Sequence, residues 1–205
     1  MSGKITWGNE YILSLRRQDL YPVLSEFWAS DTVGIDANMW ATAVTGTSTV
    51  TRQVDTSSPP RVRLLTSAGV GDDARLRTVV LFRIIPTNYT TSFTIKRLIL
   101  QWEARFTSVA NIDNTSFFMG FTPTTTATRA TTNIVGFGLT TDALRQVTDN
   151  GGTESETTPS TVPTLTNWNE YRIEVTRVDT ANTIQFFIND VLTGTHSTAA
   201  NIPDV

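Results

Sequence analysis

The feature that most constrains the fold is one run of alternating residues, Leu98-Ile-Leu-Gln-Trp-Glu-Ala-Arg-Phe106. Its even positions are apolar, and its odd positions after Ile99 are polar. Successive side chains of a β-strand point to opposite faces, so a period of two is typical of a strand with one buried face. The run therefore predicts a half-buried strand with Trp102 on the inward side.

Two more segments alternate in the same way and predict an antiparallel hairpin, residues 171–176 and 184–188, with turn-forming residues between them. The Asn189-Asp190 pair suits a tight turn with positive φ, so residues 191–196 are predicted to return as a strand. Further strands are expected at residues 47–54, 61–65, 77–85, 117–121 and 134–139. This number of short strands favours two packed sheets.

Helical signals are few. Residues 9–18 predict one short helix, with Tyr11, Ile12 and Leu15 on one side. Such a helix is marginal without tertiary support, so we expect residues 1–25 to form an arm, an anchoring segment or an edge element, and residues 26–205 to form one domain. The polar segments 122–128 and 149–161 are rich in turn formers and are predicted to be loops.

The composition narrows the classes of partner. Only 17% of the residues are charged, so Thr, Ser and Asn must supply most of the polar surface, and the net charge of -3 lacks the basic excess that nucleic-acid phosphates require. No apolar stretch approaches the roughly 20 residues that cross a bilayer, and polar sequence follows Met1. We expect neither a nucleic acid nor a membrane as partner. The absence of cysteine excludes disulfides, thiolate zinc sites and thiol nucleophiles.

From Glu26-Phe-Trp28 onward, the order of segments resembles the concanavalin A-like lectin and glucanase superfamily, especially its members among phage virion proteins. The segments that carry the resemblance are residues 98–106, 116–122, 135–138, 168–175 and 187–192. It implies an all-β fold, a two-sheet antiparallel jelly-roll sandwich preceded by an N-terminal arm. A strand order of this kind indicates a fold and does not define a function.

The C-terminal end departs from the resembling family. Those proteins usually continue after the segment that corresponds to Asn201-Ile-Pro203 with strands that close the sandwich, whereas the present sequence reaches Val205. A missing strand leaves an unpaired sheet edge. Either the N-terminal arm occupies the position of the missing strand, or a neighbouring subunit does so by strand addition, or the natural chain is longer.

Catalytic chemistry finds little support in the residues. Glycan hydrolysis needs two nearby carboxylates, and the resembling glucanases carry Glu-x-Asp-x-Glu on one strand, a triplet that this chain lacks. Glu103 stands between Gln101 and Arg105 on the outward side of its strand, which indicates a surface acid beside a cation. His196 is the only histidine and is expected to have a structural or surface role, so a catalytic triad or a histidine metal cluster is not supported. The chain is therefore predicted not to be an enzyme.

Calcium is the metal that the resemblance implies, because many of the resembling lectins bind it with loop oxygens. Three sets of residues could supply ligands: Asp72 with Asp73; Asn111, Asp113 and Asn114; and Asp149 with Asn150. None has a diagnostic spacing, and turns recruit Asp and Asn for their own geometry. Calcium binding is kept as an alternative, and no other cofactor is predicted.

Sugar binding by stacking needs exposed aromatic rings with polar groups beside them. The candidate ligand-binding residues are Trp40, Tyr89 and Trp168, which lie near predicted strand ends. The alternative is that these side chains cover the hydrophobic core.

The residues and the resemblance together predict a non-enzymatic virion component of a phage: a capsid decoration, head-fibre or tail-associated protein. Its expected partners are other virion proteins, neighbouring subunits in an oligomer or a strand exchange, and a cell-surface glycan. A free carbohydrate-binding, lectin-like module is the alternative, followed by a glycan-cleaving enzyme.

Overall fold

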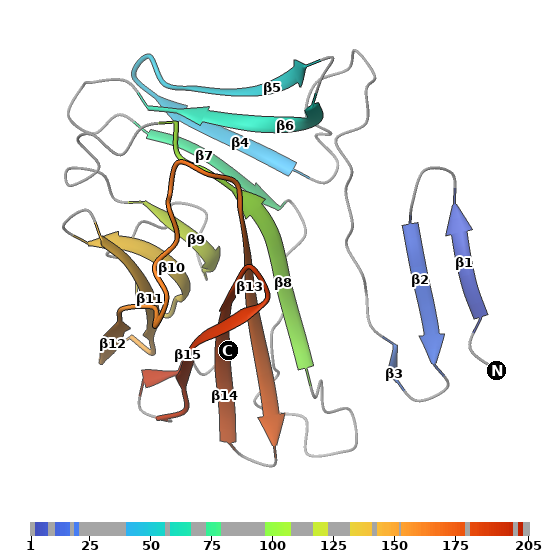
Figure 1. Cartoon of the computed structure of the whole chain (residues 1–205), viewed down its shortest axis with the longest axis vertical. Helices are drawn as coiled ribbons and strands as arrows, with labels where there is room; N and C mark the ends of the chain where they lie inside the picture. Colours follow the sequence, from blue (N-terminus) through green and yellow to red (C-terminus); the bar gives the residue numbers. More distant parts are fainter. Residues whose placement is uncertain are drawn as a thin grey trace. The chain divides into compact units, whose positions relative to one another are not determined.

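The computed structural model describes residues 3–7, 11–16, 19–20, 40–55, 58–66, 73–78, 97–107, 117–122, 132–140, 143–151, 153–178, 181–198 and 201–202. Within these residues the protein is all-β, as predicted, and every strand pairing is antiparallel. The chain divides into two units, residues 1–81 and 82–205. Figure 1 labels the strands of both. The predicted boundary between residues 25 and 26 lies outside the described residues and stays a prediction.

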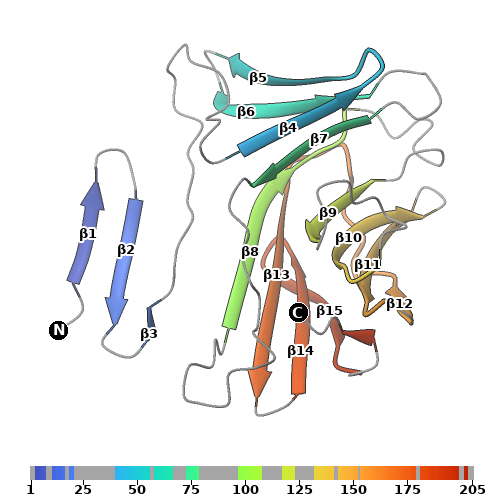
Figure 2. The same cartoon turned by 180° about the vertical axis from the view of Figure 1, so that it is seen from behind.

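The first unit contains three small sheets, which Figure 2 shows from behind. One is formed by β1 (Gly3–Trp7), β2 (Tyr11–Arg16) and β3 (Asp19–Leu20). The second pairs β4 (Trp40–Thr45) with β7 (Asp73–Thr78), and the third pairs β5 (Thr49–Asp55) with β6 (Ser58–Leu65). The strands predicted at residues 47–54 and 61–65 are confirmed as β5 and β6. The strand predicted from Arg77 begins inside β7, and residues 79–85 lie outside the described part.

The helix predicted over residues 9–18 is wrong. Residues Tyr11–Arg16 form β2, which pairs with β1 in a register that runs from Gly3 opposite Leu15 to Trp7 opposite Tyr11. Tyr11, Leu13 and Leu15 fit a strand's period of two, and the preceding Gly8-Asn9 is a sequence that favours a tight turn. Pairing with β1 supplies the hydrogen-bond partners, whereas a helix this short is marginal by itself.

The second unit is a β-sandwich of two four-stranded sheets. One sheet has the order β15-β14-β13-β8, in which β8 is Arg97–Ala104, β13 is Asn169–Val178, β14 is Ala181–Ile188 and β15 is Val191–His196. The other has the order β12-β11-β10-β9, in which β9 is Phe118–Phe121, β10 is Val135–Thr140, β11 is Ala143–Asp149 and β12 is Glu154–Thr157. Their inward faces share one hydrophobic core.

Aromatic rings fill the space between the two sheets. Phe137 of β10 lies edge-on to Tyr171 of β13 and to Phe186 of β14, with ring centroids 5.2 and 5.3 Å apart, and all three residues are fully buried. Trp102 of β8 stacks on Tyr171 at 5.9 Å and donates a hydrogen bond from Nε1 to the Met119 sulfur of β9 at 3.0 Å. The prediction that Trp102 faces inward is confirmed, while Ile99, Gln101 and Glu103 on the same strand are exposed.

The predicted hairpin and the turn that follows it are also confirmed. β13 pairs with β14 from Tyr171 opposite Ile188 to Val178 opposite Ala181. Asn189 and Asp190 have φ values of 51° and 63°, so β15 returns beside β14 through a turn with two positive φ angles. Asn and Asp tolerate this conformation better than most residues, which is why the pair predicts a tight turn.

Two strands of the sandwich were not predicted. β11 carries the polar residues Gln146 and Thr148 at inward positions, so its hydrophobic alternation is broken. β12 occupies residues 154–157 inside the segment expected to be a loop, and that expectation is wrong there. An edge strand is often short and charged, as Glu-Ser-Glu-Thr is, and such a strand looks like a loop in sequence. Residues 123–128 of the other predicted loop lie outside the described part.

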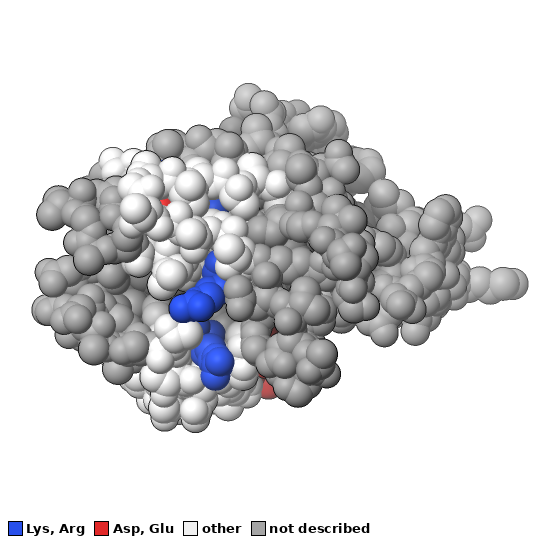
Figure 3. All heavy atoms as spheres, turned by 90° about the horizontal axis from the view of Figure 1, so that it is seen from above, with Lys and Arg blue, Asp and Glu red and all other residues white. Residues whose placement is uncertain are grey.

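The surface agrees with the low charge of the chain. On the face drawn in Figure 3, the described atoms are mostly those of uncharged residues, with a few basic and fewer acidic side chains among them. Within the described residues, no helix is long and apolar enough to cross a membrane.

We expect Phe137→Ala to destabilise the sandwich by about 3–5 kcal/mol, because it removes the ring that both sheets contact. Ile99→Ala is the control, since Ile99 is 46% exposed and its loss should change stability by at most about 0.5 kcal/mol. Denaturant unfolding followed by circular dichroism compares the two. Equal effects of the two substitutions would contradict the assigned core.

Candidate functional site

A cluster of polar side chains lies between the sheets, beside the aromatic core; four of its members are buried, and the fifth, Thr157, is exposed on the edge strand β12. We call it the inter-sheet polar cluster; its members are Gln146, Thr148, Thr157, Thr193 and His196. They come from β11, β12 and β15, so the cluster joins one sheet to the edge strand of the other. Buried polar groups are costly unless they are hydrogen-bonded, and each member of the cluster has a hydrogen-bond partner within it.

His196 is held at both ring nitrogens. Nδ1 is 2.9 Å from the hydroxyl oxygen of Thr148, and Nε2 is 2.8 Å from that of Thr157. The ring lies edge-on to Phe186, with centroids 5.2 Å apart. Burial lowers the pKa of His196 below its ordinary value. A neutral imidazole can accept at one nitrogen and donate at the other, so two hydroxyl groups satisfy it completely.

Gln146 fixes the second half of the cluster. Its Nε2 donates to Thr193 Oγ1 at 2.6 Å, and Thr193 Oγ1 donates to the Phe186 carbonyl at 3.1 Å. A Cβ at Gly194 would overlap the side-chain oxygen of Gln146, so any larger residue there would have to displace the Gln146 amide. The amide of Ser160 donates to the Thr193 carbonyl at 2.9 Å. The segment after β12 therefore covers part of the β15 edge, and the cluster serves to close the sandwich.

The outward face of β8 and β13 carries a second group, which we call the outer-face site. The strand register sets Glu103 opposite Glu170 and Gln101 opposite Arg172. Beside these pairs, Arg105 lies over the Trp168 ring, with its guanidinium carbon 5.1 Å from the ring centroid. Trp168 is 40% exposed. An exposed aromatic side chain beside charged and amide groups has the chemistry of a binding surface.

The segment that carries Trp168 is fixed by hydrogen bonds. Asn169 donates from Nδ2 to the carbonyls of Thr164 and Asn167, at 3.0 and 2.8 Å. Asn189 donates to Asn169 Oδ1 at 3.0 Å and accepts from the Glu170 amide at 2.9 Å. The loop before β13 is thereby tied to the turn between β14 and β15. A ligand that meets Trp168 meets a preorganised surface, which lowers the entropic cost of binding.

The acid pair was missed in the sequence. Glu103 was interpreted as a lone acid beside a cation, whereas its cross-strand neighbour is Glu170 and the Arg105 guanidinium lies over Trp168 instead. One carboxylate oxygen of Glu170 is buried and has no hydrogen-bond partner among the described residues. Like charges placed directly opposite each other destabilise a sheet. The alternation of both strands was visible, but only the register reveals which outward residues are neighbours.

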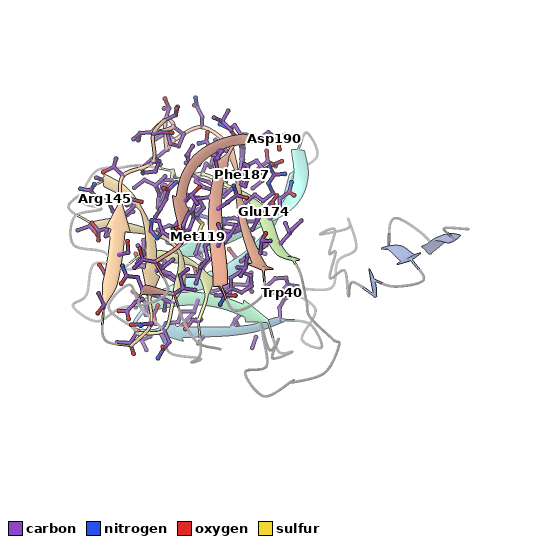
Figure 4. The ribbon with its side chains drawn as sticks, turned by 90° about the horizontal axis from the view of Figure 1, so that it is seen from below. Trp40, Met119, Arg145, Glu174, Phe187 and Asp190 are labelled. Atoms are coloured by element: carbon purple, nitrogen blue, oxygen red, sulfur yellow. The ribbon has the colours of Figure 1, made fainter. Side chains whose placement is uncertain are left out.

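Arg172 organises the rest of this face. Its guanidinium lies 4.2 Å over the Phe187 ring and pairs with Glu174 and Asp190, each at 3.4 Å. Figure 4 shows Glu174, Phe187 and Asp190 near one another, apart from Arg145. Arg145 belongs to the other sheet, where it pairs with Glu156 at 3.2 Å. The Arg172 guanidinium therefore interacts with residues of its own sheet and of the turn that follows β14.

Of the three predicted ligand-binding residues, one belongs to this site. Trp168 is part of the outer-face site. Trp40 begins β4 in the first unit and is partly buried. Tyr89 lies outside the described residues.

The predicted calcium ligands have other uses where they are described. Asp149 Oδ1 accepts from the Gly151 amide and Asn150 Oδ1 from the Thr153 amide, as in turns, and Asp73 pairs with Arg75. Asp72, Asn111, Asp113 and Asn114 lie outside the described residues. In the part of the chain that the structure describes, no three His, Asp or Glu residues gather where they could hold a metal ion. Calcium binding stays a prediction.

Comparisons with family models, with curated proteins and with solved structures find no match to this chain. The resemblance to the concanavalin A-like superfamily therefore stays a prediction, and the function has to be argued from the geometry.

Acid should weaken the sandwich through His196. Because burial lowers its pKa, the unfolded chain binds the proton more readily than the folded protein does. The free energy of unfolding should be highest above the unfolded pKa of about 6.5 and fall below it by at most about 1.4 kcal/mol per pH unit, until the lowered folded pKa is passed. Denaturant unfolding across this range measures the slope.

The control for this prediction is His196→Gln, which keeps hydrogen-bonding capacity and removes the titration. Its stability should be nearly flat over the same pH range. If the two proteins lose stability in parallel, His196 is not the group responsible.

Proposed function

We propose that this protein is a non-enzymatic structural and binding component of a phage virion, a capsid decoration, head-fibre or tail-associated protein with a concanavalin A-like jelly-roll. The observation that carries the binding role is the preorganised outer-face site, in which the partly exposed Trp168 is stacked with Arg105 on a hydrogen-bonded segment. The virion assignment rests on the strand order from residue 98 onward. The two-sheet sandwich is in keeping with it.

The use of the buried polar residues supports a structural interpretation. Residues 1–205 contain a single histidine, and the inter-sheet polar cluster holds both of its ring nitrogens with threonine hydroxyls. A general base must have a nitrogen free to take a substrate proton, whereas both ring nitrogens of His196 are hydrogen-bonded to threonine hydroxyls. The two ring nitrogens of His196 thus serve to hold the sheets together.

In this proposal the N-terminal segment attaches the sandwich to the particle. Deletion of residues 1–25 should abolish incorporation into virions and leave the unfolding transition of the sandwich unchanged, because the described residues of its core lie between residues 102 and 202. Purified particles assembled with either form, probed for the protein, measure incorporation. Unchanged incorporation would contradict this role for the segment.

A glycan is the ligand that the outer-face site favours, since the Trp168 ring can stack on a sugar and the acids beside it can accept hydroxyl hydrogen bonds. We expect Trp168→Ala to reduce binding on a glycan array at least tenfold. Ile99→Ala on the same sheet face should bind normally. Release of sugar from a capsular polysaccharide, lost in Glu103→Gln, would contradict the non-enzymatic proposal.

A further inference from the structure

The loop between β11 and β12 contains the one Asn-Gly pair of residues 1–205, Asn150-Gly151. The loop is short, because Asp149 at the end of β11 is opposite Glu154 at the start of β12. Asn150 is partly buried and Gly151 is exposed. Glycine has no side chain to obstruct its own amide nitrogen, so this nitrogen can approach the side-chain carbonyl of the preceding asparagine.

Two hydrogen bonds of this loop involve the atoms that such an approach would bring into reaction. The amide of Gly151 donates to Asp149 Oδ1 at 2.5 Å, and the amide of Thr153 donates to Asn150 Oδ1 at 3.1 Å. The Asp149 carboxylate is therefore at the proton that the Gly151 nitrogen must lose in order to act as a nucleophile. The Thr153 amide is at the oxygen on which negative charge would collect. These are the positions of a general base and of an oxyanion donor.

The surrounding structure holds this arrangement in place. Asp149 is 9% exposed, and its amide donates to the Ile134 carbonyl at 3.0 Å. Gly151 has a φ of 94°, and a Cβ at this position would lie 3.1 Å from the side-chain nitrogen of Asn133. A glycine is favoured here by both conditions. Reacting groups that are held together react faster than groups that must first find each other.

We propose that Asn150-Gly151 is a self-modification site, at which the chain converts Asn150 first to a succinimide and then to aspartate or isoaspartate. The Gly151 nitrogen forms a bond to Asn150 Cγ while its proton passes to Asp149. The bond between Cγ and Nδ2 then breaks, and Nδ2 leaves as ammonia with the proton that Asp149 received. Water opens the succinimide at either carbonyl and is the only other reactant.

The modification would alter the connection between two strands of the inter-sheet polar cluster. Either product adds a negative charge to a loop that already carries Asp149 and Glu154 at opposite positions. Isoaspartate also adds one methylene group to the backbone of the loop. The loop joins the strands of Thr148 and Thr157, which hold the two ring nitrogens of His196.

The test is the rate of this conversion in the full chain at neutral pH. Peptide mapping by mass spectrometry detects the gain of about 1 Da at Asn150, and labelling with an isoaspartate methyltransferase detects isoaspartate. We expect the folded protein to react at least about tenfold faster than a synthetic peptide of residues 145–155, because the peptide does not hold the base and the oxyanion donor in place.

Asp149→Ala removes the base and should slow the conversion at least about tenfold. Glu154→Ala is the matched control, because it removes the acid opposite Asp149 and leaves the Asp149 carboxylate available to the Gly151 amide. Its rate should stay within about twofold of the wild-type rate. Circular dichroism shows whether each variant is folded.

Faster conversion in folded Asp149→Ala than in the wild type overturns the proposal, because the carboxylate would then restrain the loop instead of activating it. Conversion of the wild-type protein no faster than that of the peptide also overturns it. The comparison with the peptide uses no variant, so it decides the question even if Asp149→Ala does not fold.

Discussion

The second unit depends on the contact between Phe137 on one sheet and the pair Tyr171 and Phe186 on the other. These rings fix which residues of β13 and β14 face inward. A shift of β13 by one residue would replace Tyr171 in the interior with Arg172, which burial does not tolerate. The same register sets Glu170 on the outside, near the contact between Arg105 and Trp168, so the outer-face site is a consequence of how the core packs.

The inter-sheet polar cluster adds specificity to this hydrophobic contact. Apolar residues alone attract the sheets without selecting one alignment, whereas Gln146 and His196 are satisfied only when β11 and β12 meet β15 as observed. Gly194 makes room for this approach. Burial also holds the phenol of Tyr171 in its neutral form, because it raises the pKa of this group to about 12.

The sequence predicted the parts of the fold that follow from local alternation. The inward position of Trp102, the hairpin of β13 and β14 and the turn at Asn189-Asp190 each have a signal within a few residues. β11 lacks such a signal, because its inward polar residues Gln146 and Thr148 are stabilised by partners almost 50 residues away. β12 lacks one because it is a short polar edge strand. The Glu103 and Glu170 pair was missed for a similar reason, since it exists only through the register of two distant strands. At the N-terminus, the same apolar residues fit a helix or a strand, and pairing decided between them.

The central claim is that the two sheets of the second unit stack with these aromatic rings between them. Nuclear Overhauser effects between ring protons of Phe137 and those of Tyr171 and Phe186 measure it directly. Strong cross-peaks are expected, because the ring centroids lie 5.2 and 5.3 Å apart. Cross-peaks confined to pairs within one sheet, with the β10–β11 and β13–β14 pairings intact, would contradict the account.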